Sequence, residues 1–156
     1  MTAQNVEKVY EKYAWILIFG IGVLTFVTGV IHALGINTDP ASAESIVGMT
    51  LSELKISNPS FFNLYNFYFR FGGLSDLGFA FFIIVISATA YRMGKRWAWY
   101  AFWFIPAFFL GSAGITMSVG SSLSDIIPFI TLFVILSLLG LLLPFRKFFP
   151  KGDKTQ

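Results

Sequence analysis

The fold is decided by residues 14–34, which read AWILIFGIGVLTFVTGVIHAL and contain no charged side chain. A membrane-spanning helix needs about 20 mostly apolar residues to cross a hydrocarbon core of about 30 Å. This stretch meets both conditions and predicts a transmembrane helix. A cleaved signal peptide is the competing interpretation. We retain the span because its apolar run exceeds the roughly 7–15 residues of a signal-peptide core.

Three further apolar runs follow, at residues 70–91, 97–119 and 126–143. They predict an all-α, polytopic membrane protein, a four-transmembrane-helix up-down bundle that forms a single domain over residues 1–156. Apolar and aromatic character already begins at Phe61. The run from there to Tyr91 is too long for one perpendicular span, so we assign residues 35–69 to an outer loop with a short helix.

The composition excludes several classes of protein. Hydrophobic residues make up 56% of the 156 residues and charged residues only 12%, about half of what a soluble domain carries. This excludes a water-soluble globular enzyme, a nucleic-acid-binding module and a disordered tail. The absence of Cys and the single His argue against disulfides, thiolate metal sites and multi-histidine metal sites. We therefore expect no metal, no cofactor and no nucleic-acid partner.

Basic residues predict the orientation in the membrane. Nine of the eleven fall at the two termini or in the turn between the second and third spans, and the other two are Lys55 and Arg70. Because cytoplasmic loops carry the excess of Lys and Arg, we expect a multi-pass protein of the plasma membrane with both termini cytoplasmic and lipid as a partner. The nine are Lys8, Lys12, Arg92, Lys95, Arg96, Arg146, Lys147, Lys151 and Lys154.

The outer loop carries two helix-start signals. Asp39-Pro40 can open a helix, because Asp caps and Pro suits the first helical position. Thr50 and Glu53 have the spacing of a capping box, and the helix that it starts should end before Asn58-Pro59. Asp125 is predicted to cap the fourth span.

Small residues predict which faces pack together, because lipid tails are as apolar as leucine. Gly22, Thr25, Gly29 and His32 form one stripe on the first span, which should face the other helices. Two pairs of small residues at four-residue spacing, Ala107 with Gly111 and Gly114 with Ser118, predict a second packing face on the third span. The fourth span is almost uniformly apolar, so we expect it to face lipid.

Polar side chains gather near the outer mouth and form the candidate site. A charged side chain at the centre of a membrane span raises the free energy of insertion by about 2.5–3.5 kcal/mol, so such a residue is a candidate for a functional role. We predict that His32, Arg70 and Asp76 form one hydrogen-bonded cluster, with Thr28 beside it. Asn66 shares a helical face with Arg70 and Asn63, as would suit an anionic headgroup or a neighbouring subunit. A structural role and proton or ligand handling both stay open for His32 and Asp76.

Two short stretches resemble a known group of proteins. Residues 91–101, YRMGKRWAWYA, and residues 48–54, GMTLSEL, followed by Asn58-Pro59, are similar to segments of small prokaryotic four-helix membrane proteins that are broadly DoxX-like. These matches cover about a fifth of the chain. The resemblance implies a four-helix bundle in a prokaryotic inner membrane, and it transfers no catalytic residue.

Three classes of function are consistent with these observations. A non-catalytic bundle, either an accessory subunit or homo-oligomer component of a membrane complex or a protein that binds lipid or another apolar molecule, fits the scarcity of reactive groups. A small proton-coupled transporter or exporter would use Asp76. A membrane isomerase or redox-associated protein would have Asp76 and His32 as acid and base. We expect the first.

Overall fold

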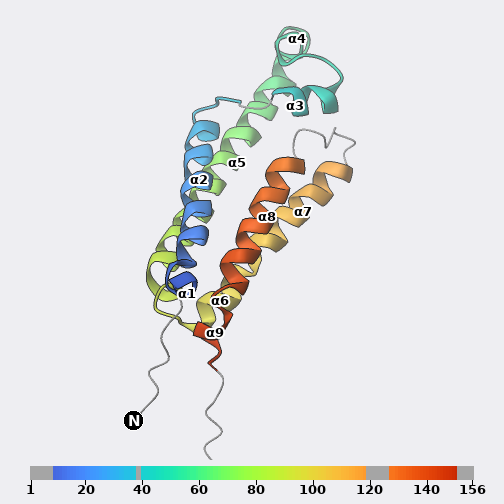
Figure 1. Ribbon diagram of the computed structural model, residues 1–156. Helices are drawn as coiled ribbons and strands as arrows, with labels where there is room; N and C mark the ends of the chain where they lie inside the picture. Colours follow the sequence, from blue (N-terminus) through green and yellow to red (C-terminus); the bar gives the residue numbers. More distant parts are fainter. Residues whose placement is uncertain (1–8, 38–39, 119–126, 151–156) are drawn as a thin grey trace, which may run out of the picture.

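A computed structural model describes residues 9–37, 40–118 and 127–150, and within these ranges the chain is helical with no strand (Figure 1). The predicted all-α class is therefore confirmed for the described part. The elements are α1 (Val9–Tyr13), α2 (Trp15–Ala33), α3 (Pro40–Val47), α4 (Leu51–Ser57), α5 (Pro59–Ile86), the π-helical turn η1 (Ser87–Tyr91), α6 (Arg96–Phe102), α7 (Phe104–Ser118), α8 (Ile127–Leu142) and α9 (Phe145–Phe148).

Three described helical stretches are long and apolar enough to cross a membrane, and they are Val9–Ala33, Pro59–Tyr91 and Arg96–Ser118. The fourth apolar helix, α8, has 16 described residues, which correspond to about 24 Å of helix axis. The connection that precedes it, with the predicted cap Asp125, lies outside the described residues. The predicted cap Asp39 lies outside them as well.

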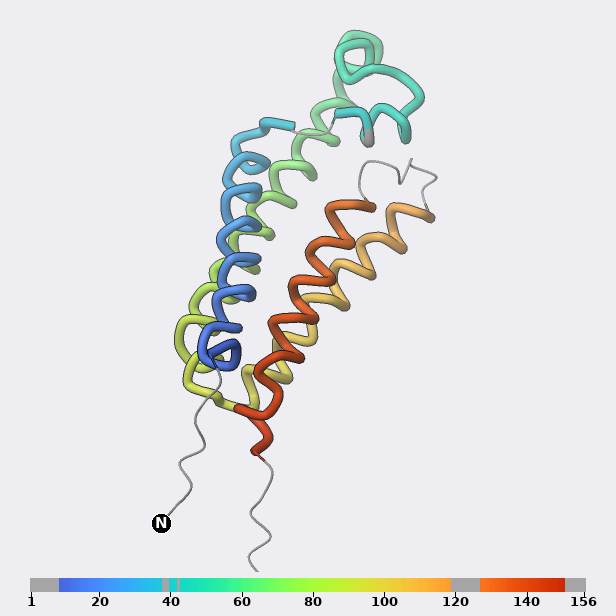
Figure 2. The backbone as a smooth tube through the Cα atoms, in the orientation of Figure 1, coloured from blue at the N-terminus to red at the C-terminus, as the bar shows by residue number. Residues whose placement is uncertain are grey.

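The long helices form two packed pairs, α2 with α5 and α7 with α8, and α8 also contacts α2 (Figure 2). Short helices α1, α6 and α9 gather at the end where both described chain ends lie, and α3 and α4 sit at the opposite end of α5. We call these the inner and outer ends. The two pairs separate toward the outer end in this view.

Buried side chains concentrate near the inner end. Ile18, Tyr91, Leu141 and Phe148 are each 2% exposed or less and belong to one apolar cluster, which Phe102, Ile105 and Phe133 join from α6, α7 and α8. Our expectation that the fourth apolar helix faces lipid is therefore wrong for one side of α8. There Phe133, Ser137 and Leu141 are buried, and a Cβ added to Gly140 would meet the Ile18 side chain at 2.7 Å.

At the inner end, three side chains donate hydrogen bonds to backbone carbonyls near the C-terminal ends of helices, where carbonyls lack partners within the helix. The Tyr91 hydroxyl donates to the Gly140 carbonyl at 2.6 Å, and Trp99 Nε1 donates to the Leu141 carbonyl at 2.9 Å. Arg96 Nε donates to the Phe148 carbonyl at 3.0 Å. The π-helical turn η1 places Tyr91 here, so that its ring also contacts the rings of Phe102 and Phe148.

The third apolar stretch is interrupted between α6 and α7, at Trp103. Pro106 causes this break, because it has no amide hydrogen to donate to the Phe102 carbonyl one turn earlier. The interruption therefore falls three residues before the proline itself. The predicted packing face of this stretch is wrong, since a Cβ added to Gly111 or Gly114 would meet nothing within 4 Å among the described residues.

The outer helix α4 confirms the predicted capping box. The Glu53 amide donates to Thr50 Oγ1 at 3.2 Å, and Glu53 Oε2 accepts from the Thr50 amide at 2.9 Å and from its hydroxyl at 2.8 Å. These bonds hold the pKa of the exposed Glu53 carboxyl below its ordinary value, so the carboxylate form that accepts both is present at neutral pH. As predicted, α4 ends before Asn58-Pro59.

Helix α5 begins earlier than the sequence suggested. Pro59 occupies its first turn, and the Asn58 side chain accepts from the Phe61 amide at 3.1 Å. Residues 59–69, which we assigned to the outer loop, are therefore continuous with the helix that contains Arg70 and Asp76. A helix with a strong cap and no internal proline has no physical reason to stop at the membrane boundary.

Candidate functional site

The candidate site is organised by a close contact between the outer halves of α2 and α5. A Cβ added to Gly73 would overlap the Ala33 amide nitrogen and lie 2.7 Å from His32 Cβ. One added to Gly29 would lie 3.0 Å from the Gly73 carbonyl oxygen. The predicted packing role of Gly29 is therefore confirmed, and Gly73 is its partner on the opposite helix.

His32 and Asp76 lie together at this contact. Asp76 Cβ is beside Gly29, and the Asp76 carboxylate is close enough to His32 for an electrostatic interaction. The imidazole also contacts the Phe69 ring, with ring centroids 4.8 Å apart. Both side chains are half-buried. A carboxylate beside an imidazole can share or pass a proton, and it can equally well hold two helices in register.

Arg70 is not part of this pair. Its Nε donates to the Ala33 carbonyl at 3.0 Å, at the last residue of α2. A cation there is favoured by the negative end of the helix dipole. Within the described chain Arg70 forms no ion pair with Asp76, in contrast to the single cluster that we predicted. The two residues are six positions apart on α5, which turns their side chains toward different sides of the helix.

The chain beyond α2 turns sharply next to Arg70. Gly35 has a φ of +84°, which side chains disfavour, and it lies against the Arg70 side chain and Asn66 Oδ1. Asn37 Nδ2 then donates to the Tyr65 hydroxyl at 2.8 Å, which ties this turn to α5. Sequence reasoning missed Asn37 and Tyr65, because no local pattern identifies partners that are 28 residues apart.

Thr28 takes no direct part in either group. Its hydroxyl bonds within α2, to the Leu24 carbonyl at 3.2 Å and the Thr25 carbonyl at 3.0 Å. The structure thus divides the five predicted site residues into three sets. His32 and Asp76 lie at the contact between α2 and α5. Arg70 and Asn66 are on α5, beside the C-terminal end of α2. The Thr28 hydroxyl bonds within α2.

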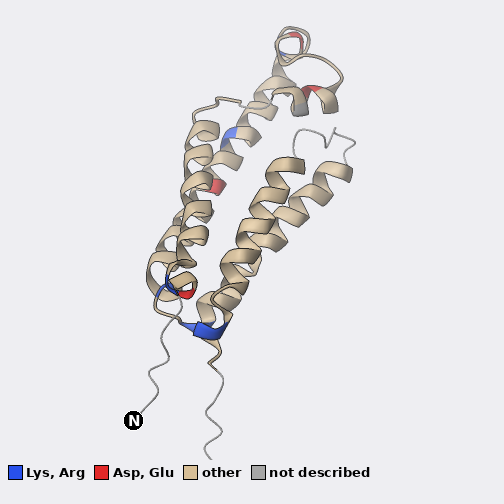
Figure 3. Ribbon diagram, in the orientation of Figure 1, with Lys and Arg blue, Asp and Glu red and all other residues tan. Residues whose placement is uncertain are grey.

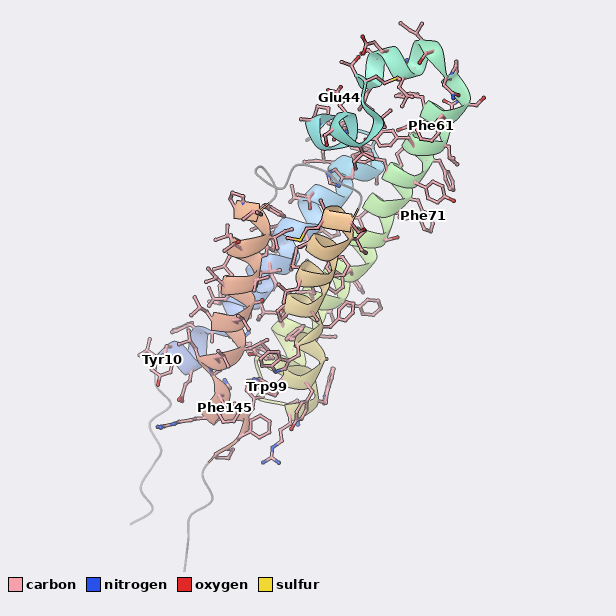
Figure 4. The ribbon with its side chains drawn as sticks, turned by 90° about the vertical axis from the view of Figure 1, so that its right-hand side faces the viewer. Tyr10, Glu44, Phe61, Phe71, Trp99 and Phe145 are labelled. Carbon is pink, nitrogen blue, oxygen red and sulfur yellow. The ribbon has the colours of Figure 1, made fainter. Side chains whose placement is uncertain are left out.

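Two hollows lie along the outer part of α5. Figure 4 labels one lining residue of each, Phe61 and Phe71 on α5. The larger has a volume of about 470 Å³ and combines polar side chains with an apolar wall, whereas the other, of about 370 Å³, is apolar throughout. The first is lined by Ala33, Asn63, Asn66, Phe67, Arg70, Phe71 and Leu74. The second is lined by Phe61, Leu64, Tyr65, Tyr68 and Phe69.

The described residues contain no group of three or more His, Cys, Asp or Glu side chains that could hold a metal ion. The site offers a carboxylate–imidazole pair, a guanidinium, two carboxamides and aromatic walls. Comparisons with protein-family models, curated proteins and solved structures yield no significant match to this chain.

Proposed function

We propose that the chain crosses the plasma membrane four times, in up-down order, with its inner end in the cytoplasm. The described basic residues outside α4 and α5 support this orientation, because all of them lie at the inner end (Figure 3). The fourth crossing would use α8, which is apolar throughout its described length. This arrangement would agree with the DoxX-like architecture that the sequence resembles.

We propose further that the protein is a non-catalytic bundle that binds a lipid or a similar apolar molecule along the outer part of α5. The observation that carries this proposal is the length of the helix. Residues Pro59–Tyr91 form 33 continuous helical residues, about 50 Å at 1.5 Å per residue, against a hydrocarbon core of about 30 Å. The part of the helix that extends beyond this thickness at the outer end exposes Phe61, Leu64 and Phe67. An exposed apolar surface of this kind is typical of a binding site.

The titratable groups favour binding over transport or catalysis. Within the four apolar stretches the charged or titratable side chains other than Tyr are His32, Arg70 and Asp76, all in the outer half. A proton path through the bundle needs groups in the inner half too, which these stretches lack. An accessory subunit or homo-oligomer would use the same aromatic surface against a neighbouring chain.

Binding of added lipid by the purified protein tests the proposal. We expect native mass spectrometry of the protein in mild detergent to show one bound diacylglycerol after titration with that lipid. Phe67→Ala/Phe71→Ala should weaken this binding several-fold, because it removes the wall of the larger hollow. Phe81→Ala/Phe82→Ala is the matched control, since these rings are similarly exposed, at 56% and 62% against 60% and 56%, and lie deeper on the same helix.

The two double variants separate a site from general lipid contact. Equal loss in both would show only that exposed aromatic rings touch lipid. Failure of the wild-type protein to bind either diacylglycerol or a phospholipid with the same acyl chains would contradict the proposed function.

A further inference from the structure

We propose that Arg70, Asn66 and Asn63 bind the phosphate headgroup of an anionic phospholipid from the outer leaflet, with an acyl chain on Phe67, Phe71 and Leu74. The inference rests on the proposed function and deepens it, because it names the chemistry of the ligand. The three polar residues and the three apolar ones line one continuous hollow.

The guanidinium of Arg70 is oriented and still has capacity to bind. Its Nε is used by the Ala33 carbonyl at 3.0 Å, which fixes the plane of the group. Its two terminal nitrogens have no partner among the described residues. Arginine carries four N–H donors on those nitrogens, in a fork that matches two phosphate oxygens. A guanidinium already held in place loses less conformational entropy when it binds.

Two carboxamides extend the donor set. Asn63 and Asn66 precede Arg70 by seven and four residues, so they lie on the same side of α5. Neither side chain makes a hydrogen bond within the described chain. Their NH₂ groups can donate to phosphate or glycerol oxygens, and both line the hollow with Arg70.

The depth of the hollow matches the headgroup boundary. Arg70 lies 21 residues from Tyr91 along α5 and η1, about 31 Å at 1.5 Å per residue, close to the thickness of the hydrocarbon core. Leu74 is about 6 Å deeper and Asn63 about 10 Å farther out by the same rise. Phe71 and Leu74 therefore face the acyl region, Phe67 lies at the level of Asn66, and the two amides face the headgroups.

Charge complementarity selects an anionic lipid over a neutral one. Asp76 does not pair with Arg70, so no described carboxylate neutralises the guanidinium. The other described basic residue at the outer end, Lys55, lies over the Phe62 ring at 5.7 Å and does not line the hollow. It therefore provides a control of equal charge on the same side of the membrane.

The test compares two lipids with the same acyl chains, phosphatidylglycerol and diacylglycerol, by native mass spectrometry in a neutral detergent. We expect the wild-type protein to bind phosphatidylglycerol at least about tenfold more tightly, which corresponds to about 1.4 kcal/mol. Arg70→Gln should abolish this preference, so that the variant binds the two lipids with equal affinity. Lys55→Gln should keep the preference.

Arg70→Gln also loses the hydrogen bond to the Ala33 carbonyl and could therefore disturb the fold. A second variant tests the headgroup site without removing that bond. Asn63→Ala/Asn66→Ala keeps that bond and should weaken phosphatidylglycerol binding about threefold. If this double variant and Arg70→Gln both kept the wild-type preference, the inference would be wrong. It would also be wrong if millimolar inorganic phosphate displaced the lipid, because free phosphate would then be the species recognised.

The two proposals fail in different ways. Equal binding of the two lipids by the wild-type protein overturns the headgroup site and leaves the proposed function standing. Binding of neither lipid overturns both.

Discussion

Gly73→Ala is expected to destabilise the protein by about 3 kcal/mol, the upper part of the range for overpacked contacts. The added methyl group would overlap the Ala33 amide nitrogen and lie 2.7 Å from His32 Cβ. A backbone atom cannot rotate away as a flexible side chain can, so α2 and α5 would have to separate. Separation would also move the Ala33 carbonyl away from Arg70 and change the larger hollow.

The adjacent glycine provides a matched control. Among the residues that the structure describes, a Cβ on Gly72 would meet nothing within 4 Å, and alanine is favoured over glycine in a helix by about 1 kcal/mol. Gly72→Ala should therefore be neutral or stabilising, although it makes the same chemical change one position earlier. Size-exclusion chromatography after heating in detergent measures both. Equal melting temperatures for the two variants would show that α2 and α5 do not meet at Gly73.

Tyr91→Phe is expected to cost about 1–3 kcal/mol, because it leaves the Gly140 carbonyl without its donor in a buried site. The hydroxyl lies 2.6 Å from that carbonyl, and the residue is 1% exposed. Because the site is buried within the protein, water does not reach the carbonyl to replace the lost bond. The substitution keeps the ring, so its contacts with Phe102 and Phe148 remain and the measured change belongs to the hydrogen bond.

Intrinsic tryptophan fluorescence on heating suits this measurement, since Trp99 bonds to the next carbonyl along α8, that of Leu141. Tyr100→Phe is the control, because Tyr100 is 61% exposed. A Tyr91→Phe protein that melts with the wild type would contradict the hydrogen-bonded closure of the inner end.

The local features of the fold could be predicted from sequence, and the faces of the helices could not. Thr50 and Glu53 act through bonds to their own turn, so their spacing was sufficient to place α4. In a membrane, side chains that face lipid and side chains that face other helices are both apolar. Small and polar residues, glycine above all, were then the cue to packing. It was right for Gly29 and wrong for Gly111, which meets nothing in the described structure.

The candidate site was predictable in part for a similar reason. The spacing of Asn63, Asn66 and Arg70 puts them on one side of any helix, and they line one hollow. The bond from Arg70 to the Ala33 carbonyl depends on the register of α2 against α5, which Gly73 sets. A register between distant helices leaves no local trace in the sequence, so Arg70 was assigned to Asp76 instead.

Labelling of single cysteines in intact cells tests the four-crossing arrangement most directly, since the chain contains no native cysteine. A membrane-impermeant maleimide should label Ser52→Cys in α4 and Ser122→Cys before α8 from outside. It should label Tyr13→Cys, Met93→Cys and Phe145→Cys only after the membrane is permeabilised. Labelling of Phe145→Cys from outside, or protection of Ser122→Cys, would contradict the four crossings and the outer position of the Arg70 hollow.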